Sequence, residues 1–225
     1  MDITAEFLLA FAKITWIDLL LSGDNAVVIA MACRSLPDRQ RRAGILLGAA
    51  AAIMLRVLMT APITYILEIP LIRAIGAILL VWIAVKLLLP TEPDERDVEG
   101  HASLWRAVRT VALADAVMSL DNVVAIAAAA DGSLLLIVIG LAMSIPFIVF
   151  GSSLIGSVLE RVPALVWAGA GVLGWIAGEM VASEPLFEQV AHHDALEHLA
   201  APTGAGIVIL LGCVVRARIQ KARSL

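Results

Sequence analysis

The sequence has little charge for its length. Asp, Glu, Lys and Arg make up only 16% of its 225 residues, whereas about a quarter of a typical soluble domain is charged. Hydrophobic residues make up 61%, and the mean hydropathy is +0.96. This composition excludes an ordinary soluble domain and indicates that a lipid bilayer is the solvent for most of the chain.

Cysteine is almost absent, and a basic N-terminal segment is missing. The two cysteines, Cys33 and Cys213, provide neither a disulfide framework nor a zinc-binding pattern, and we interpret both as buried, unreactive thiols. The first residues, MDITAEF, are acidic, whereas a cleavable signal peptide begins with basic ones. We therefore expect no disulfide scaffold, no structural zinc and no cleaved leader.

Seven apolar segments follow one another along the chain. A membrane-spanning helix needs about 20 mostly apolar residues. The segments run over residues 7–33, 43–67, 70–89, 104–130, 133–159, 162–183 and 204–215. We therefore predict an all-α integral membrane protein with seven transmembrane helices and no room for a soluble domain.

Basic residues in the connections indicate the orientation of these spans. The first, third and fifth connections and the C-terminal tail contain Arg or Lys, whereas residues 184–202 contain neither. Because basic connections stay in the cytoplasm, we predict a multi-pass protein of the bacterial inner membrane with its N-terminus outside and its C-terminus in the cytoplasm. The acidic segment 184–202 also carries His193 and His198, which suits either an interfacial helix or a weak outer attraction site for cations.

The sequence contains an internal repeat. Residues 18–30, DLLLSGDNAVVIA, match residues 115–127, DAVMSLDNVVAIA, at seven of thirteen positions, and the tripeptide WIA of residues 82–84 recurs at 175–177. Because the repeated unit holds three spans, the second copy enters the membrane from the opposite side. Transporters with such inverted repeats hold their substrate near the midplane, between the copies.

This repeat divides the chain into five parts. They are a first three-helix repeat (1–90), a cytoplasmic linker (91–103), a second, inverted three-helix repeat (104–183), an extracytoplasmic loop (184–203), and a seventh helix with a basic cytoplasmic tail (204–225). The two repeats account for six of the seven predicted spans.

Four aspartates lie near the middle of predicted spans, where insertion disfavours each carboxylate by about 2.5–3.5 kcal/mol. They are Asp18 and Asp24 in the first copy and Asp115 and Asp121 in the second. On straight antiparallel helices, Asp18 would lie level with Asp121, about 9 Å from the level shared by Asp24 and Asp115. We therefore expect two stacked sites, or one site and a gate.

Helical spacing places Asp18, Ser22 and Asn25 on one face of the first copy. The equivalent face of the second copy holds Asp115, Met118, Ser119 and Asn122. Asp24 and Asp121 point elsewhere unless the helix is unwound, which Gly23 favours in the first copy and Leu120 does not in the second. Arg56 is the main candidate for a buried counter-charge, but one guanidinium cannot offset four carboxylates, and the surplus requires a bound cation or protons. The predicted metal ligands are Asp18, Asp24, Asn25, Asp115, Asp121, Asn122, Ser22, Ser119 and Met118.

The ligand types narrow the choice of cation. Carboxylate, amide and hydroxyl oxygens suit Mg²⁺, Ca²⁺ or Mn²⁺. The thioether of Met118, beside Asp115, would add a softer contact that favours Mn²⁺.

The two clusters carry a resemblance to a known family. An acidic residue, three positions, Ser, any residue and Asp-Asn occur as Asp18-Ser22-Asp24-Asn25 and again as Asp115-Ser119-Asp121-Asn122. This doubled pattern resembles that of the TerC family of integral membrane proteins, and nearly the whole chain is similar to the short seven-span members. The resemblance implies Mn²⁺ export, with acidic metal-site positions at Asp18, Asp24, Asp115 and Asp121.

We therefore expect a transporter that exports a divalent cation, Mn²⁺ before Ca²⁺ or another ion, through a midplane site and in exchange for protons. No catalytic residue, cofactor, enzymatic activity or nucleic-acid partner is expected. The expected partners are the cation and the lipid bilayer, and formation of a homo-oligomer is left open.

Two other classes of protein stay open. Ser22-Gly23-Asp24, Asp121 and the Pro-Ala-Leu of residues 163–165 resemble the motifs of an intramembrane aspartyl protease, in which two carboxylates activate water. An amino-acid exporter of the LysE type would need a counter-charge for the substrate carboxylate, and Arg56 would suit that role. Peptide cleavage, or flux stimulated by amino acids rather than metal, would identify these classes.

Overall fold

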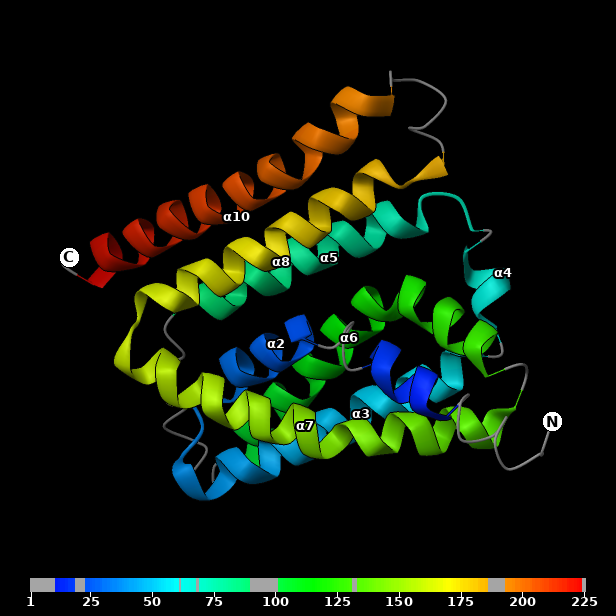
Figure 1. Cartoon of the computed structure of the whole chain (residues 1–225). Coiled ribbons are helices and arrows are strands. Elements are labelled where there is room, and N and C mark those ends of the chain that lie inside the picture. Colours follow the sequence, from blue (N-terminus) through cyan, green and yellow to red (C-terminus); the bar gives the residue numbers. More distant parts are fainter. Residues whose placement is uncertain are drawn as a thin grey trace. The chain divides into compact units, whose positions relative to one another are not determined.

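The computed structural model describes residues 11–18, 23–60, 62–67, 69–89, 101–130, 133–185 and 193–223, and this part contains helices and turns without any strand. The prediction of an all-α protein is confirmed. A helix at Phe11–Asp18 comes first. The others are α2 (Gly23–Cys33), α3 (Asp38–Thr60), α4 (Ile63–Leu67), α5 (Ile72–Leu88), α6 (His101–Ala129), α7 (Leu134–Arg161), α8 (Ala164–Ala182) and α10 (His193–Arg223) (Figure 1).

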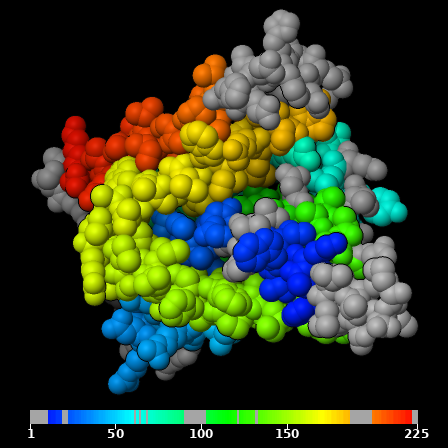
Figure 2. Space-filling view, in the orientation of Figure 1, coloured from blue at the N-terminus to red at the C-terminus, as the bar shows by residue number. Residues whose placement is uncertain are grey.

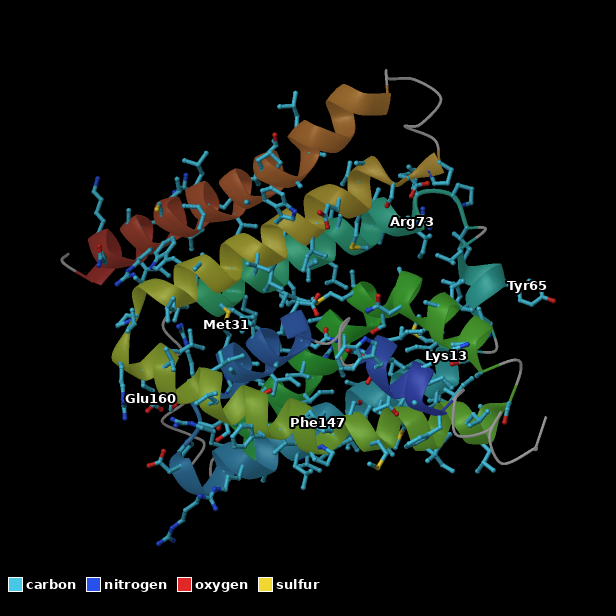
Figure 3. The ribbon with its side chains drawn as sticks, viewed as in Figure 1. Lys13, Met31, Tyr65, Arg73, Phe147 and Glu160 are labelled. Carbon is cyan, nitrogen blue, oxygen red and sulfur yellow. The ribbon has the colours of Figure 1, made fainter. Side chains whose placement is uncertain are left out.

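Several of these helices suit a lipid bilayer. Four of the described helices are long and apolar enough to cross it, and six spans result if each of two bent pairs counts as one. Helix α5 has 17 residues and is about 26 Å long. Large apolar side chains such as Phe147 and Tyr65 are exposed, and Tyr65 projects away from α4 (Figure 3). The protein is thus multi-pass, while the count of seven spans stays a prediction.

One compact unit consists of residues 1–68 and 95–160. In it α3 packs along α6, and α2 contacts both of these helices. The helix Phe11–Asp18 rests on α7, as the dark-blue and yellow-green surfaces in Figure 2 show, because Gly140 has no side chain to keep Ile14 away. Gly48 likewise admits Val111. These two close contacts join the helix Phe11–Asp18 to α7 and α3 to α6, while the inverted repeat stays a prediction from the sequence.

The other compact unit consists of residues 69–94 and 161–225. Its helices α5, α8 and α10 lie side by side, with α8 in contact with both neighbours (Figure 1). A Cβ atom on Gly178 would overlap the backbone of Ala200, and one on Gly174 would overlap Gly204. Small residues of this kind let two membrane helices approach closely.

Each half of the sequence contributes to both units. Helix α5 of the first half packs against α8 of the second, whereas α3 of the first half packs against α6 of the second. The compact units therefore do not coincide with the segments 1–90 and 104–183. The five-part division of the chain stays a prediction about its repeat and topology.

The structure differs from the sequence-based expectation at two places in α10. The helix begins at His193 rather than near Gly204, and it contains Pro202. The residues before Pro202, HDALEHLAA, are rich in Ala, Leu and Glu, which favour helix. Cys33 is buried as expected, but Cys213 is exposed, so that its predicted burial is wrong. Most of the spanning part of α10 lies outside the packed interior, which explains the exposed thiol.

Candidate functional site

Arg56 is buried within the unit formed by residues 1–68 and 95–160. It projects from α3, and only 2% of its side chain is exposed. Its Nη2 lies 2.6 Å from Oδ1 of Asp115 and its Nε 3.1 Å from Oδ2 of the same residue. This is a two-point ion pair of the kind in which the planar guanidinium matches a carboxylate. A buried charge is tolerated only with such partners.

The same guanidinium also bonds to the first sequence copy. Its Nη1 donates a hydrogen bond to Oδ1 of Asp18, which is fully buried. Two hydroxyl groups complete the arrangement, because Nε lies 2.8 Å from Oγ of Ser119 and Ser144 donates to Oδ2 of Asp18. We call Arg56, Asp18, Asp115, Ser119 and Ser144 the Arg56 cluster.

Four helices position this cluster. Asp18 is the last described residue of the helix Phe11–Asp18, Asp115 and Ser119 are one turn apart on α6, and Ser144 lies on α7. Helix α3 begins after Pro37, whose carbonyl oxygen accepts hydrogen bonds from two backbone amides of the first turn. The carboxylate of Asp38 lies in this first turn, where the positive end of the helix dipole stabilises a negative charge.

The prediction that Asp115 and Ser119 share a face of α6 is confirmed, because Nε of Arg56 bonds to both side chains. Met118 beside them is also buried, and Asn122 is half-buried.

The predicted levels of the aspartates are corrected. Because one guanidinium bonds to both Asp18 and Asp115, these carboxylates do not lie on two levels about 9 Å apart. The expectation assumed straight helices. The chain turns by 51° between Phe11–Asp18 and Gly23–Cys33, and by 66° between Ser103–Leu120 and Asn122–Ala129. The second bend forms although Leu120 stands where the first copy has Gly23.

Asp24 and Asn25 lie in the first turn of α2. Oδ1 of Asp24 accepts from the backbone N–H of Asn25 at 2.8 Å, and the positive end of a helix dipole favours this carboxylate. Asp24 is half-buried and interacts electrostatically with Arg56 and Asp115. Asn25 is only 4% exposed, yet neither atom of its amide finds a hydrogen-bond partner among the described residues. Because most buried amides are hydrogen-bonded, the amide of Asn25 is a candidate ligand group.

Two of the predicted ligands cannot be placed. Ser22 and the side chain of Asp121 lie outside the described residues. Among the side chains that the structure does describe, no three His, Cys, Asp or Glu groups converge closely enough to hold a metal ion. Asp18, Asp24, Asp115 and Arg56 together carry a formal charge of −2. Arg56 thus offsets one of these three carboxylates, of which Asp18 and Asp115 are buried and Asp24 is half-buried.

Two buried polar residues are not among the predicted site residues. Ser144 was one of several small residues in an apolar segment, and its polarity inside that segment is the signal that could have found it. Glu184 is the first residue of the predicted outer loop, yet it is buried, and its Oε1 accepts from the backbone N–H of Leu71 at 3.0 Å. Arg73, labelled in Figure 3, donates to the carbonyl oxygen of Ser183 at the same end of α5 and α8.

Known proteins resemble the chain over most of its length. The pattern of the integral membrane protein TerC family matches residues 3–224. The uncharacterized membrane protein YjbE of Bacillus subtilis is 43% identical over 206 residues, which cover 91% of this chain and 94% of that protein. The UPF0053 inner membrane protein YgdQ of Escherichia coli is 24% identical over 174 residues, covering 70% of this chain and 73% of that protein. No solved structure matches.

The resemblance inferred from the two Asp/Asn clusters is thereby confirmed. The matched pattern leaves out only the first two residues and the last one. Within it lie both sequence copies and every residue of the Arg56 cluster. This chain belongs to the integral membrane protein TerC family.

Proposed function

We propose that this chain exports a divalent metal cation, Mn²⁺ in the first place, through the Arg56 cluster and the adjoining Asp24 and Asn25. Membership of a family of integral membrane proteins supports transport. The observation that carries the proposal is the net negative charge of Asp18, Asp24, Asp115 and Arg56, together with the buried amide of Asn25, for which the described residues supply no hydrogen-bond partner. A carboxylate inside a membrane is energetically unfavourable, and such residues typically line an ion pathway or bind an ion.

The side chains in this region suit a hard or borderline cation. Carboxylate, amide and hydroxyl oxygens are the ligands that Ca²⁺, Mg²⁺ and Mn²⁺ prefer. Met118, three residues after Asp115 on α6, is buried, and a thioether ligand from it would favour Mn²⁺ over Ca²⁺. The cation is the transported substrate, and Asp18, Asp24, Asp115 and Asp121 are its proposed acidic ligands.

Export in exchange for protons completes the proposal. Carboxylates must be deprotonated to bind a metal, so that metal entry releases protons. Inverted repeats give a transporter two related conformations that open to opposite sides. In the proposed cycle the metal leaves the cell while protons enter it. The cycle combines proton release on metal binding with the two conformations that open to opposite sides.

The two rival classes receive less support. An amino-acid exporter would need Arg56 for the substrate carboxylate, but two carboxylates of the protein already hold this guanidinium. A protease would need only Asp24 and Asp121 to share a proton, which leaves the buried Asp18 and Asp115 without a role. Neither rival uses the doubled Asn25 and Asn122.

Mn²⁺ flux into proteoliposomes tests the proposal with the variants Asp24→Asn and Asp121→Asn. We expect the Mn²⁺ flux of both variants to fall more than about tenfold below that of the wild type. Even the loss of a residue that only hydrogen-bonds to a metal ligand lowers metal affinity or activity by about that factor. Both should fold, since they remove a buried charge rather than add one. Glu179→Gln is the control, because Glu179 is an intramembrane acid whose Oε1 accepts from Trp175, and Gln retains this acceptor. Undiminished flux in both Asn variants would place the pathway elsewhere.

A further inference from the structure

Arg56 lies where a cation shared by the two copies would have to bind. Asp18 and Asp115 are equivalent positions of the repeat, 97 residues apart, and the guanidinium bonds to both. It engages both oxygens of Asp115, and the second oxygen of Asp18 accepts from Ser144. All four carboxylate oxygens of the two predicted ligands are thus hydrogen-bonded.

A divalent cation and this guanidinium cannot bind the same carboxylates together. Hard divalent cations lie about 2.0–2.6 Å from their oxygen ligands. Nη2 of Arg56 lies 2.6 Å from Oδ1 of Asp115, so an ion on that oxygen would come within a few ångströms of a positive charge. In a buried site with little water to screen it, that repulsion is large. Direct ligation by Asp18 and Asp115 therefore requires Arg56 to leave them.

We infer that Arg56 is a tethered competitor of the transported cation. The inference rests on the proposed function and adds a role for a residue outside the predicted ligand set. The entering ion displaces the guanidinium from Asp18 and Asp115, and the returning guanidinium displaces the ion. Competition weakens binding and speeds release. It also keeps the carboxylates partly neutralised after the ion has left.

A fixed structural ion pair would behave in the opposite way. If Arg56 only held α3 against α6, its removal would leave Asp18 and Asp115 poorly placed, and metal would bind equally or more weakly. If Arg56 competes, its removal makes metal bind more tightly and leave more slowly. The sign of the change in affinity separates the two roles, which loss of activity alone would not.

The first test is Mn²⁺ binding to the purified full-length chain, followed by the electron paramagnetic resonance signal of free Mn²⁺. We expect Arg56→Gln to bind Mn²⁺ about tenfold more tightly than wild type. The free energy for this change is only a small part of the repulsion between two close positive charges in a buried site. Its turnover in proteoliposomes should fall. Arg109→Gln is the matched control, because Arg109 lies exposed on α6, and it should resemble wild type.

A second pair of variants keeps the test valid if Arg56→Gln does not fold. Asp115→Asn retains Arg56, whereas the double variant Arg56→Gln/Asp115→Asn removes it together with its partner, so that no buried charge of that pair is left alone. We expect the double variant to bind Mn²⁺ more tightly than Asp115→Asn. Equal or weaker binding in the double variant would show that Arg56 does not compete with the ion.

The wild-type arm separates this inference from the proposed function. If the wild type binds and transports Mn²⁺ but Arg56→Gln, folded, binds it no more tightly, the competitor role alone is overturned. If neither the wild type nor any variant binds or transports Mn²⁺, Ca²⁺ or Mg²⁺, the proposed function is overturned and the competitor role with it.

Discussion

The hydroxyl group of Ser144 donates a hydrogen bond to Oδ2 of Asp18, although 126 residues separate them along the chain. Ser144 Oγ also lies 2.7 Å from the carbonyl oxygen of Leu141 in its own helix. The contact joins α7 to the end of the helix Phe11–Asp18. Both oxygens of the buried Asp18 carboxylate therefore accept a hydrogen bond, because Arg56 donates to Oδ1.

Replacing Ser144 by Ala should therefore destabilise the protein. When a buried carboxylate loses a hydrogen-bond donor, the free energy of unfolding falls by about 1–3 kcal/mol. We therefore expect a lower unfolding temperature in detergent. Ser157→Ala is the control, because Ser157 lies exposed on α7 and makes the same local bond to the carbonyl oxygen of Leu154. Equal unfolding temperatures for the two variants would mean that the bond to Asp18 contributes no stability.

The predicted orientation can be tested by thiol labelling. In a background with Cys33 and Cys213 replaced by Ala, a cysteine at the exposed position Ser183 should react with an impermeant reagent in intact cells. A cysteine at Ser224, which lies outside the described residues, should react only after permeabilisation, because the basic tail stays in the cytoplasm. The reverse pattern would invert the topology.

The packing of α8 against α10 predicts opposite effects for two glycine substitutions. Gly178→Ala should destabilise the protein by about 1–3 kcal/mol, as overpacking does, because a Cβ there would overlap the backbone of Ala200. Gly206→Ala meets no atom within 4 Å and should be neutral or stabilising by up to about 1 kcal/mol through helix propensity. Unfolding temperatures of the two purified variants measure the difference. A Gly178→Ala protein as stable as the wild type would contradict the close contact.

Exchange for protons predicts a pH change of defined sign. In proteoliposomes that contain a pH-sensitive dye, an inward Mn²⁺ gradient should make the interior more alkaline, because protons leave as the metal enters. Asp24→Asn liposomes serve as the control for leakage. Mn²⁺ flux without a pH change, and without dependence on an imposed pH gradient, would remove the exchange mechanism and leave the metal site intact.

Much of this architecture could be predicted because it depends on local sequence. A bilayer-spanning helix needs only enough consecutive apolar residues, so composition predicted the all-α membrane protein. Four Asp and two Asn in matching apolar surroundings revealed the repeat and the family. Helical spacing also placed Asp115 and Ser119 on one face, since that relationship lies within a single helix.

The tertiary structure alone decided how those faces meet. Periodicity says which side chains share a side of a helix, but not where two helices cross or bend. The meeting of Asp18 and Asp115 at one guanidinium, the contact from Ser144, and the burial of Glu184 all join residues more than 35 positions apart. The two contacts at Asp18 depend on the packing of side chains such as Ile14 against Gly140 and Val111 against Gly48. The burial of Glu184 depends on the packing of α5 against α8 in the other unit. Such packing is fixed only when the helices come together.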